Sequence, residues 1–166
     1  MKAESKKNMN IVFIGNSITQ GALIATPSHD APPVKAALYL TKQPSVASVK
    51  YSNQGVSGCT TTDYLPTTET LFPKAKEAAD KFADETWATL VFSIMLGTND
   101  SAITGPNGAP ASPEKYEENM KAIINQLLAL YPSWRPMFLC PQAHWQAAST
   151  ASKTSPGMFT KYQPRP

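Results

Sequence analysis

The sequence predicts a three-layer α/β/α sandwich built on a flavodoxin-like parallel sheet of four or five strands. Short apolar runs rich in β-branched or aromatic residues are typical of buried strands, and four such runs occupy residues 10–14, 46–52, 88–96 and 137–140. Helix-like stretches lie between them, at residues 33–41, 72–84 and 112–130. Strands that alternate with helices form βαβ units, so we expect a mostly parallel sheet covered by helices on both faces.

Each predicted helix has its own evidence in the sequence. The stretch 33–41 begins with proline, which suits a first helical turn, and the stretch 72–84 is rich in alanine and lysine. The stretch 112–130 opens with Ser-Pro-Glu-Lys and continues with apolar residues at helical spacing, including Tyr116, Met120 and Ile123. We interpret this apolar face as part of the core rather than as a surface for a partner helix.

The length of 166 residues fits a single domain that spans residues 1–166. We expect its core in residues 10–141 and an atypical tail in residues 142–166. The net charge of +3 belongs to the ends of the chain, because residues 11–130 hold eight lysines against eleven acidic residues, whereas residues 131–166 hold four basic residues and no acid. Four dispersed charges make a weak footprint for nucleic acid, so we expect no nucleic-acid partner.

The cysteines, histidines and apolar runs narrow the class of protein further. Cys59 and Cys140 lack the spacing of metal ligands, and only His29 and His144 accompany them, so we expect free thiols and no zinc site. No apolar run reaches the ~20 residues of a membrane-spanning helix. The first ten residues lack the apolar region of a signal peptide. We expect a cytoplasmic protein, or a periplasmic or secreted one if a signal peptide has been removed.

Small polar loops follow the first three predicted strands, and in a parallel sheet the loops at the carboxyl ends of strands form the site. They read Gly-Asn-Ser-Ile-Thr from residue 15, Asn-Gln-Gly-Val-Ser-Gly-Cys-Thr from residue 53, and Gly-Thr-Asn-Asp from residue 97. The first loop lacks the lysine of a phosphate-binding P-loop, and no G-x-G-x-x-G motif is present. With the first strand central, these loops converge on one edge of the sheet.

The converging loops offer the groups that acyl transfer requires. A serine hydroxyl is a weak nucleophile until a base takes its proton, and the oxyanion that forms on attack needs hydrogen-bond donors already aimed at it. Ser17 supplies a hydroxyl, and the donors are the backbone N–H groups of Ser17 and Gly58 and the side-chain amide of Asn99. We therefore predict Ser17, Gly58 and Asn99 as catalytic residues.

These residues carry a resemblance to the SGNH hydrolases of the GDSL esterase superfamily. The first block matches with Ser17 as nucleophile, although Asn16 stands where many members have aspartate. The second block implies that Gly58, rather than Gly55, is the oxyanion-hole glycine. The third implies that Asn99 is the oxyanion amide, and we expect its neighbour Asp100 to be a structural partner of the loop.

The resemblance implies a function and a ligand class. It is nearest to bacterial sialate O-acetylesterases and lysophospholipase-like members. The implied activity is carboxylic ester hydrolysis that removes acyl groups, above all acetyl, from carbohydrate or small esters. The implied partner is thus a small acyl ester such as an acetylated sugar, and no metal or organic cofactor is implied.

The fourth block of the family, D-x-x-H, supplies the general base and is missing, because no aspartate follows Asp100. Residues 142–166 contain no leucine, isoleucine or valine, a composition that builds neither a buried strand nor an amphipathic helix. We expect a C-terminally incomplete fold, from truncation or a frame shift after Tyr131. An open edge on the fourth strand would then favour a homodimer, and turnover would be weak or absent.

Other interpretations stay open at this point. Ser17 can be a helix-start residue with no chemistry, and we expect His29 and His144 to be surface residues. A flavodoxin-like module would bind phosphate at the first loop without a nucleophile. A ligand- or carbohydrate-binding remnant of the hydrolase fold would bind without turnover.

Overall fold

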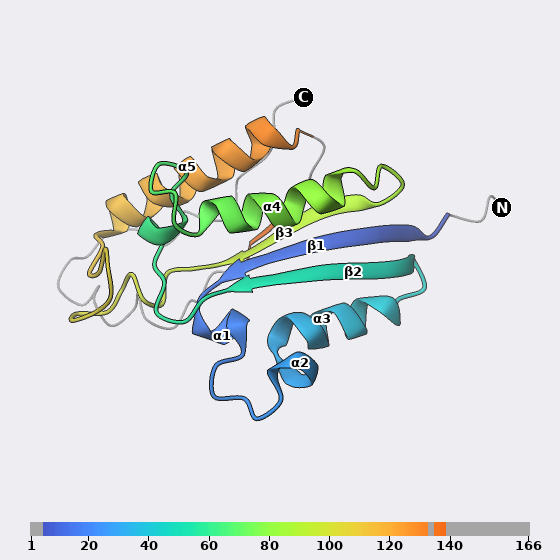
Figure 1. Ribbon diagram of the computed structural model, residues 1–166, viewed down its shortest axis with the longest axis horizontal. Coiled ribbons are helices and arrows are strands. Elements are labelled where there is room, and N and C mark those ends of the chain that lie inside the picture. Colours follow the sequence, from blue (N-terminus) through green and yellow to red (C-terminus); the bar gives the residue numbers. More distant parts are fainter. Residues whose placement is uncertain (1–4, 133–134, 139–166) are drawn as a thin grey trace, which may run out of the picture.

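A four-stranded parallel sheet in the order β2-β1-β3-β4 forms the centre of the computed structural model, which describes residues 5–132 and 135–138 (Figure 1). The strands are β1 (Lys7–Gly15), β2 (Val46–Gly55), β3 (Thr89–Met95) and β4 (Arg135–Phe138). Gly15 lies opposite Gly55 on one side and opposite Met95 on the other. The first strand is therefore central, and the first three strands end level with one another at their carboxyl ends.

Helices cover both faces of this sheet. One face carries α1 (Ser17–Gln20), α2 (Pro27–Asp30) and α3 (Pro32–Thr41), and the other carries α4 (Phe72–Ala83) and α5 (Pro113–Leu130) (Figure 1). A short 3-10 helix, η1 (Thr62–Tyr64), lies between β2 and α4. These three layers confirm the predicted α/β/α class.

The core is divided by the sheet, because side chains of a strand alternate between its faces. Val12 and Ile14 of β1 belong to the larger cluster, which includes residues of α4 and α5, such as Ala79 and Ile123. Ile11 and Phe13 belong to a smaller cluster, against which Ala36 and Leu40 of α3 pack. Both faces of β1 are thus buried, which explains why its sequence is apolar without interruption.

The predicted helices match the structure closely at their ends. Pro113 occupies the first turn of α5, and the Ser112 side chain caps that helix by accepting a hydrogen bond from the Lys115 N–H at 3.2 Å. The prolines Pro32 and Pro33 begin α3. A helix start was predicted at Ser17, and α1 begins there, whereas α2 was not predicted as a separate element, because four residues carry no periodic pattern.

The fourth strand begins earlier than its apolar run suggests. Its described part is Arg135–Phe138, which begins before the predicted start at residue 137, and it pairs with β3 through Val91 opposite Arg135 and Ile94 opposite Phe138. Within the described sheet β4 is an edge strand, as is β2. The predictions of a fifth strand, of an atypical tail in residues 142–166, and for Cys140 and His144, fall outside the described residues.

Within residues 5–132 and 135–138, no helix combines the length and apolarity that crossing a membrane requires.

Candidate active site

Ser17 is placed by a sharp corner at the end of the central strand. Asn16, which is buried, caps α1 because its Oδ1 accepts a hydrogen bond from the Ile18 N–H at 3.0 Å. Gly21 ends this four-residue helix in a left-handed conformation with φ of 83°. The corner turns the chain so abruptly that Ser17 stays half-buried at the carboxyl edge instead of entering the core.

The two glycines of the second loop have different surroundings, which separates their roles. A Cβ atom at Gly55 would lie 2.3 Å from the backbone nitrogen of Gln20, so this glycine allows α1 to pack against the end of β2. A Cβ atom at Gly58 would meet nothing within 4 Å, and Gly58 has φ of +78°. Gly58 is exposed, and the space beside its backbone is open to a ligand.

Hydrogen bonds join the three loops at this edge. The Asn99 side-chain amide donates to the Cys59 carbonyl at 2.7 Å, which links the third loop to the second. The Cys59 thiol and the Val56 N–H both donate to the Gly15 carbonyl, at 3.3 Å and 3.0 Å, which links the second loop to the first. The structure therefore brings the segments that carry Ser17, Gly58 and Asn99 to one edge of the sheet.

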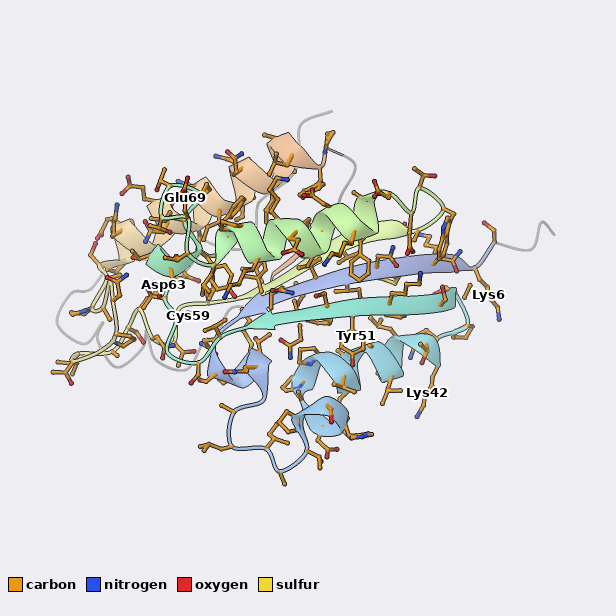
Figure 2. The ribbon with its side chains drawn as sticks, viewed as in Figure 1. Lys6, Lys42, Tyr51, Cys59, Asp63 and Glu69 are labelled. Carbon is orange, nitrogen blue, oxygen red and sulfur yellow. The ribbon has the colours of Figure 1, made fainter. Side chains whose placement is uncertain are left out.

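Asp100 is buried and binds the second loop, in agreement with its predicted structural role. Its carboxylate accepts hydrogen bonds from the backbone N–H of Thr61, at 2.9 Å, and from the Thr61 hydroxyl. Asn119 of α5 in turn donates to the Thr61 hydroxyl at 2.9 Å. Figure 2 shows the neighbouring residues Cys59 and Asp63 on the segment that follows β2.

Sequence reasoning missed the side chains that hold these loops together. Asn53 donates to the Thr19 carbonyl at 2.9 Å, and Gln20 accepts from the Ser57 N–H at 2.7 Å, so both connect α1 to the end of β2. Asn119 had a detectable signal, because it is a polar residue between Tyr116 and Ile123 on an otherwise apolar helix face. Asn53 and Gln20 had none beyond their place in polar loops.

Among the described residues, the ionisable groups nearest the loops make no hydrogen bond to the Ser17 hydroxyl. Burial raises the pKa of the Cys59 thiol to about 12, with a smaller contribution from the charge of Asp63. His29 is exposed on α2, as expected for a surface residue. Over the part of the chain that the structure describes, Ser17 makes no side-chain hydrogen bond with a histidine or carboxylate, and no cluster of three potential metal ligands occurs.

A hollow of about 670 Å³ lies at the amino ends of the strands, at the other end of the sheet from these loops. It is lined by residues near the amino ends of β1 and β3, such as Met9 and Leu90, together with Tyr131 after α5. Ser17, Gly58 and Asn99 are not among its lining residues. The candidate active site is thus defined by its loops rather than by this hollow.

The parallel sandwich and the three blocks at its carboxyl edge define a domain of the SGNH-hydrolase class. The model of the GDSL-like lipase/acylhydrolase family matches residues 13–158, most of the chain, so the protein belongs to that family. No curated protein sequence matches the chain. The predicted nearness to sialate O-acetylesterases therefore stays a prediction.

Solved structures share the fold at low sequence identity. AlinE4, an SGNH-hydrolase family esterase, is 20% identical with a TM-score of 0.51, and the match covers 83% of this chain and 60% of that one. A catalytic mutant of Axe2, an acetylxylan esterase from Geobacillus stearothermophilus, in which an aspartate is replaced by alanine, is 20% identical with a TM-score of 0.51 and coverages of 82% and 61%. A second catalytic mutant of Axe2, in which a histidine is replaced by alanine, gives 20% identity, a TM-score of 0.50 and the same coverages. The chain spans about 60% of the length of these structures.

Proposed function

We propose that this protein is a serine ester hydrolase that removes acetyl or similar small acyl groups from carbohydrate or small esters. The observation that supports the proposal is the set of hydrogen bonds that joins the loops bearing Ser17, Gly58 and Asn99 at one sheet edge, together with the open space beside Gly58. Membership in the acylhydrolase family supports ester chemistry, and the name of Axe2 as an acetylxylan esterase supports an acetylated sugar as substrate class.

In the proposed mechanism the Ser17 Oγ attacks the ester carbonyl carbon while a base takes its proton. The carbonyl oxygen becomes an oxyanion that accepts hydrogen bonds from the Ser17 N–H, the Gly58 N–H and the Asn99 amide. The C–O bond to the alcohol then breaks, the alcohol leaves with a proton, and an acyl-serine remains. Water attacks the acyl-serine, which releases the carboxylic acid and restores the Ser17 hydroxyl.

The base sets the expected rate of this chain. Catalytic mutants of Axe2 lack an aspartate or a histidine, whereas here no aspartate follows Asp100 and His144 is the only histidine after it. A serine hydrolase without its full triad retains positioning and the oxyanion hole, so we propose turnover slower than a complete relative by on the order of 10⁴–10⁶. Rapid turnover that is lost in His144→Ala would instead assign His144 as the base.

A fluorophosphonate test decides whether Ser17 is the nucleophile. We expect intact-protein mass spectrometry to show one adduct, peptide mapping to place it on Ser17, and Ser17→Ala to abolish it. Ser45→Ala is the matched control, because Ser45 is exposed just before β2, at the other end of the sheet. An adduct on another residue, or none, would refute the proposed nucleophile, and hydrolysis of p-nitrophenyl acetate on the same samples measures turnover.

The other two readings give different results in this test. A non-catalytic carbohydrate-binding remnant would bind sugar without forming an adduct. A flavodoxin-like phosphate module has less support, because α1 has only four residues and a helix that short provides a weak dipole at its start.

A further inference from the structure

Asn119 is a buried polar residue of α5. It is 1% exposed, and its side-chain amide donates to the Thr61 hydroxyl at 2.9 Å. Thr61 and Asp100, its partners in the same chain of hydrogen bonds, are each 0% exposed. Three buried polar side chains therefore connect α5 to the loop after β2 and to the loop after β3.

The chemistry of the three groups fixes the direction of these hydrogen bonds. The Thr61 hydroxyl donates its single proton to a carboxyl oxygen of Asp100, beside the Thr61 N–H that also donates to Asp100 at 2.9 Å. The hydroxyl oxygen is then left to accept, and the Asn119 amide is the donor that reaches it. Loss of Asn119 or of the hydroxyl leaves a buried polar group without its partner, which costs about 1–3 kcal/mol.

This network lies next to the proposed oxyanion donors on both loops. Asp100 directly follows Asn99, and Thr61 lies two residues after Cys59, whose carbonyl accepts the Asn99 amide at 2.7 Å. The same two loops are thus cross-linked twice, once through Asn99 and Cys59 and once through Asp100 and Thr61. A second cross-link removes the hinge freedom that a single bond between loops would allow.

We propose that Thr61 and Asn119 are positioning residues that fix the Asn99 amide and the Gly58 N–H in one geometry for the oxyanion. The part of this claim that concerns catalysis rests on the proposed esterase function. The physical reason is that a donor displaced by about 1 Å can cost on the order of 10²-fold in rate. The helix α5, which lies outside the loops, would then hold the oxyanion donors in place through the buried side chains of Asn119 and Thr61.

Matched variants separate positioning from general stability. Thr61→Val keeps the shape but removes the hydroxyl, whereas Thr61→Ser keeps the hydroxyl. Asn119→Leu removes the amide donor, and Asn125→Leu is its control on an exposed position of the same helix. Thermal unfolding of the four variants and of the unchanged protein gives the temperature below which all five are folded, and the other measurements are made below it.

The first readout is the rate at which fluorophosphonate labels Ser17, together with kcat and KM for p-nitrophenyl acetate. We expect Thr61→Val and Asn119→Leu to lower the labelling rate and kcat by about 10-fold or more, with KM changed by less than about twofold. Thr61→Ser and Asn125→Leu should stay within about threefold of the unchanged protein. Equal labelling rates in the folded Thr61→Val, Asn119→Leu and unchanged proteins would overturn the positioning role.

The second readout does not depend on any chemistry at Ser17. In ¹⁵N-labelled protein, Thr61→Val and Asn119→Leu should shift the Asn99 side-chain amide signals and speed hydrogen exchange of the Thr61 N–H, which donates to Asp100, and Thr61→Ser should not. Unchanged signals and exchange in both loss variants would overturn the inference even if Ser17 is reactive. If Ser17 of the unchanged protein is unreactive while these shifts appear, the proposed function fails and the positioning of the loops stands.

Discussion

Replacing Asn99 by alanine tests the oxyanion assignment through two effects that can be measured separately. The Asn99 amide carries two N–H groups, and one of them donates to the Cys59 carbonyl at 2.7 Å. Alanine removes that bond, and the buried Cys59 then keeps an unpaired carbonyl, so we expect a loss of stability of about 1–3 kcal/mol. It also removes the donor for the oxyanion, which should lower kcat by on the order of 10²–10³, or about 2.7–4 kcal/mol of activation free energy, with KM nearly constant.

Urea unfolding measures the loss of stability. Steady-state hydrolysis of p-nitrophenyl acetate, without urea and with the protein fully folded, measures the loss of kcat. Thr98→Val is the matched neighbour, because the buried Thr98 hydroxyl has no hydrogen-bond partner within the described part of the chain. It should leave kcat unchanged and stability equal or slightly higher. An Asn99→Ala protein that loses stability but keeps its kcat would refute the reasoning and leave Asn99 as a loop anchor only.

Four further results are expected. Gly58→Val should keep the fold but lower the free energy of unfolding by about 1–2 kcal/mol, because the Gly58 backbone is left-handed. It should also abolish Ser17 labelling, since the valine side chain would enter the open space beside the backbone, and normal labelling would contradict this. Hydrogen bonds from Lys76 and from the Tyr131 hydroxyl hold the pKa of the Asp80 carboxyl below its usual value. These contacts therefore stabilise the folded protein above about pH 4, and this stabilisation is lost as the pH falls and Asp80 is protonated. Tyr131→Phe should therefore cost about 1 kcal/mol in urea unfolding at pH 7 and less at pH 3, and a larger cost at pH 3 would argue against this contact. Iodoacetamide at pH 8 should spare Cys59 in the folded protein and modify it in urea, because a pKa near 12 leaves roughly 10³-fold less thiolate than an ordinary thiol has. Sedimentation velocity should show concentration-dependent association through the edge strand β4, and a monomer at every concentration would reject it.

The sheet and the long helices could be predicted from the sequence, because buried strands and buried helix faces leave a strong pattern of apolar residues. The run 11–14 is fully buried in β1, and the apolar spacing of α5 matches its buried face. The start of β4 was predicted two residues late, because an edge strand is paired by its backbone and does not need an apolar sequence. Pro136 lies opposite Phe92 in that strand, a residue type that sheets accept at their edges.

The sequence also identified which loops meet, but not the bonds that hold them. Strand order and parallel direction alone bring the segments after β1, β2 and β3 to one edge, so Ser17, Gly58 and Asn99 could be grouped without coordinates. The contact between Asn119 and Thr61 joins residues 58 positions apart, and nothing local in either segment indicates the other. Long-range polar contacts of this kind depend on the exact packing of α5, which a hydrophobic pattern fixes only to within a face of the helix.

Gly55 and Gly58 illustrate why the geometry adds to the motif. Both are glycines of one loop, and the sequence gives each the same freedom of backbone and the same missing side chain. The packing separates them, since the backbone of Gln20 fills the space beside Gly55 while the space beside Gly58 is empty. A backbone can approach a substrate only where the fold leaves room. The same substitution is therefore expected to disturb the protein for a different reason at each position. At Gly55 a side chain would push α1 and Ser17 away from the strand end, and at Gly58 it would occupy the place proposed for the acyl group.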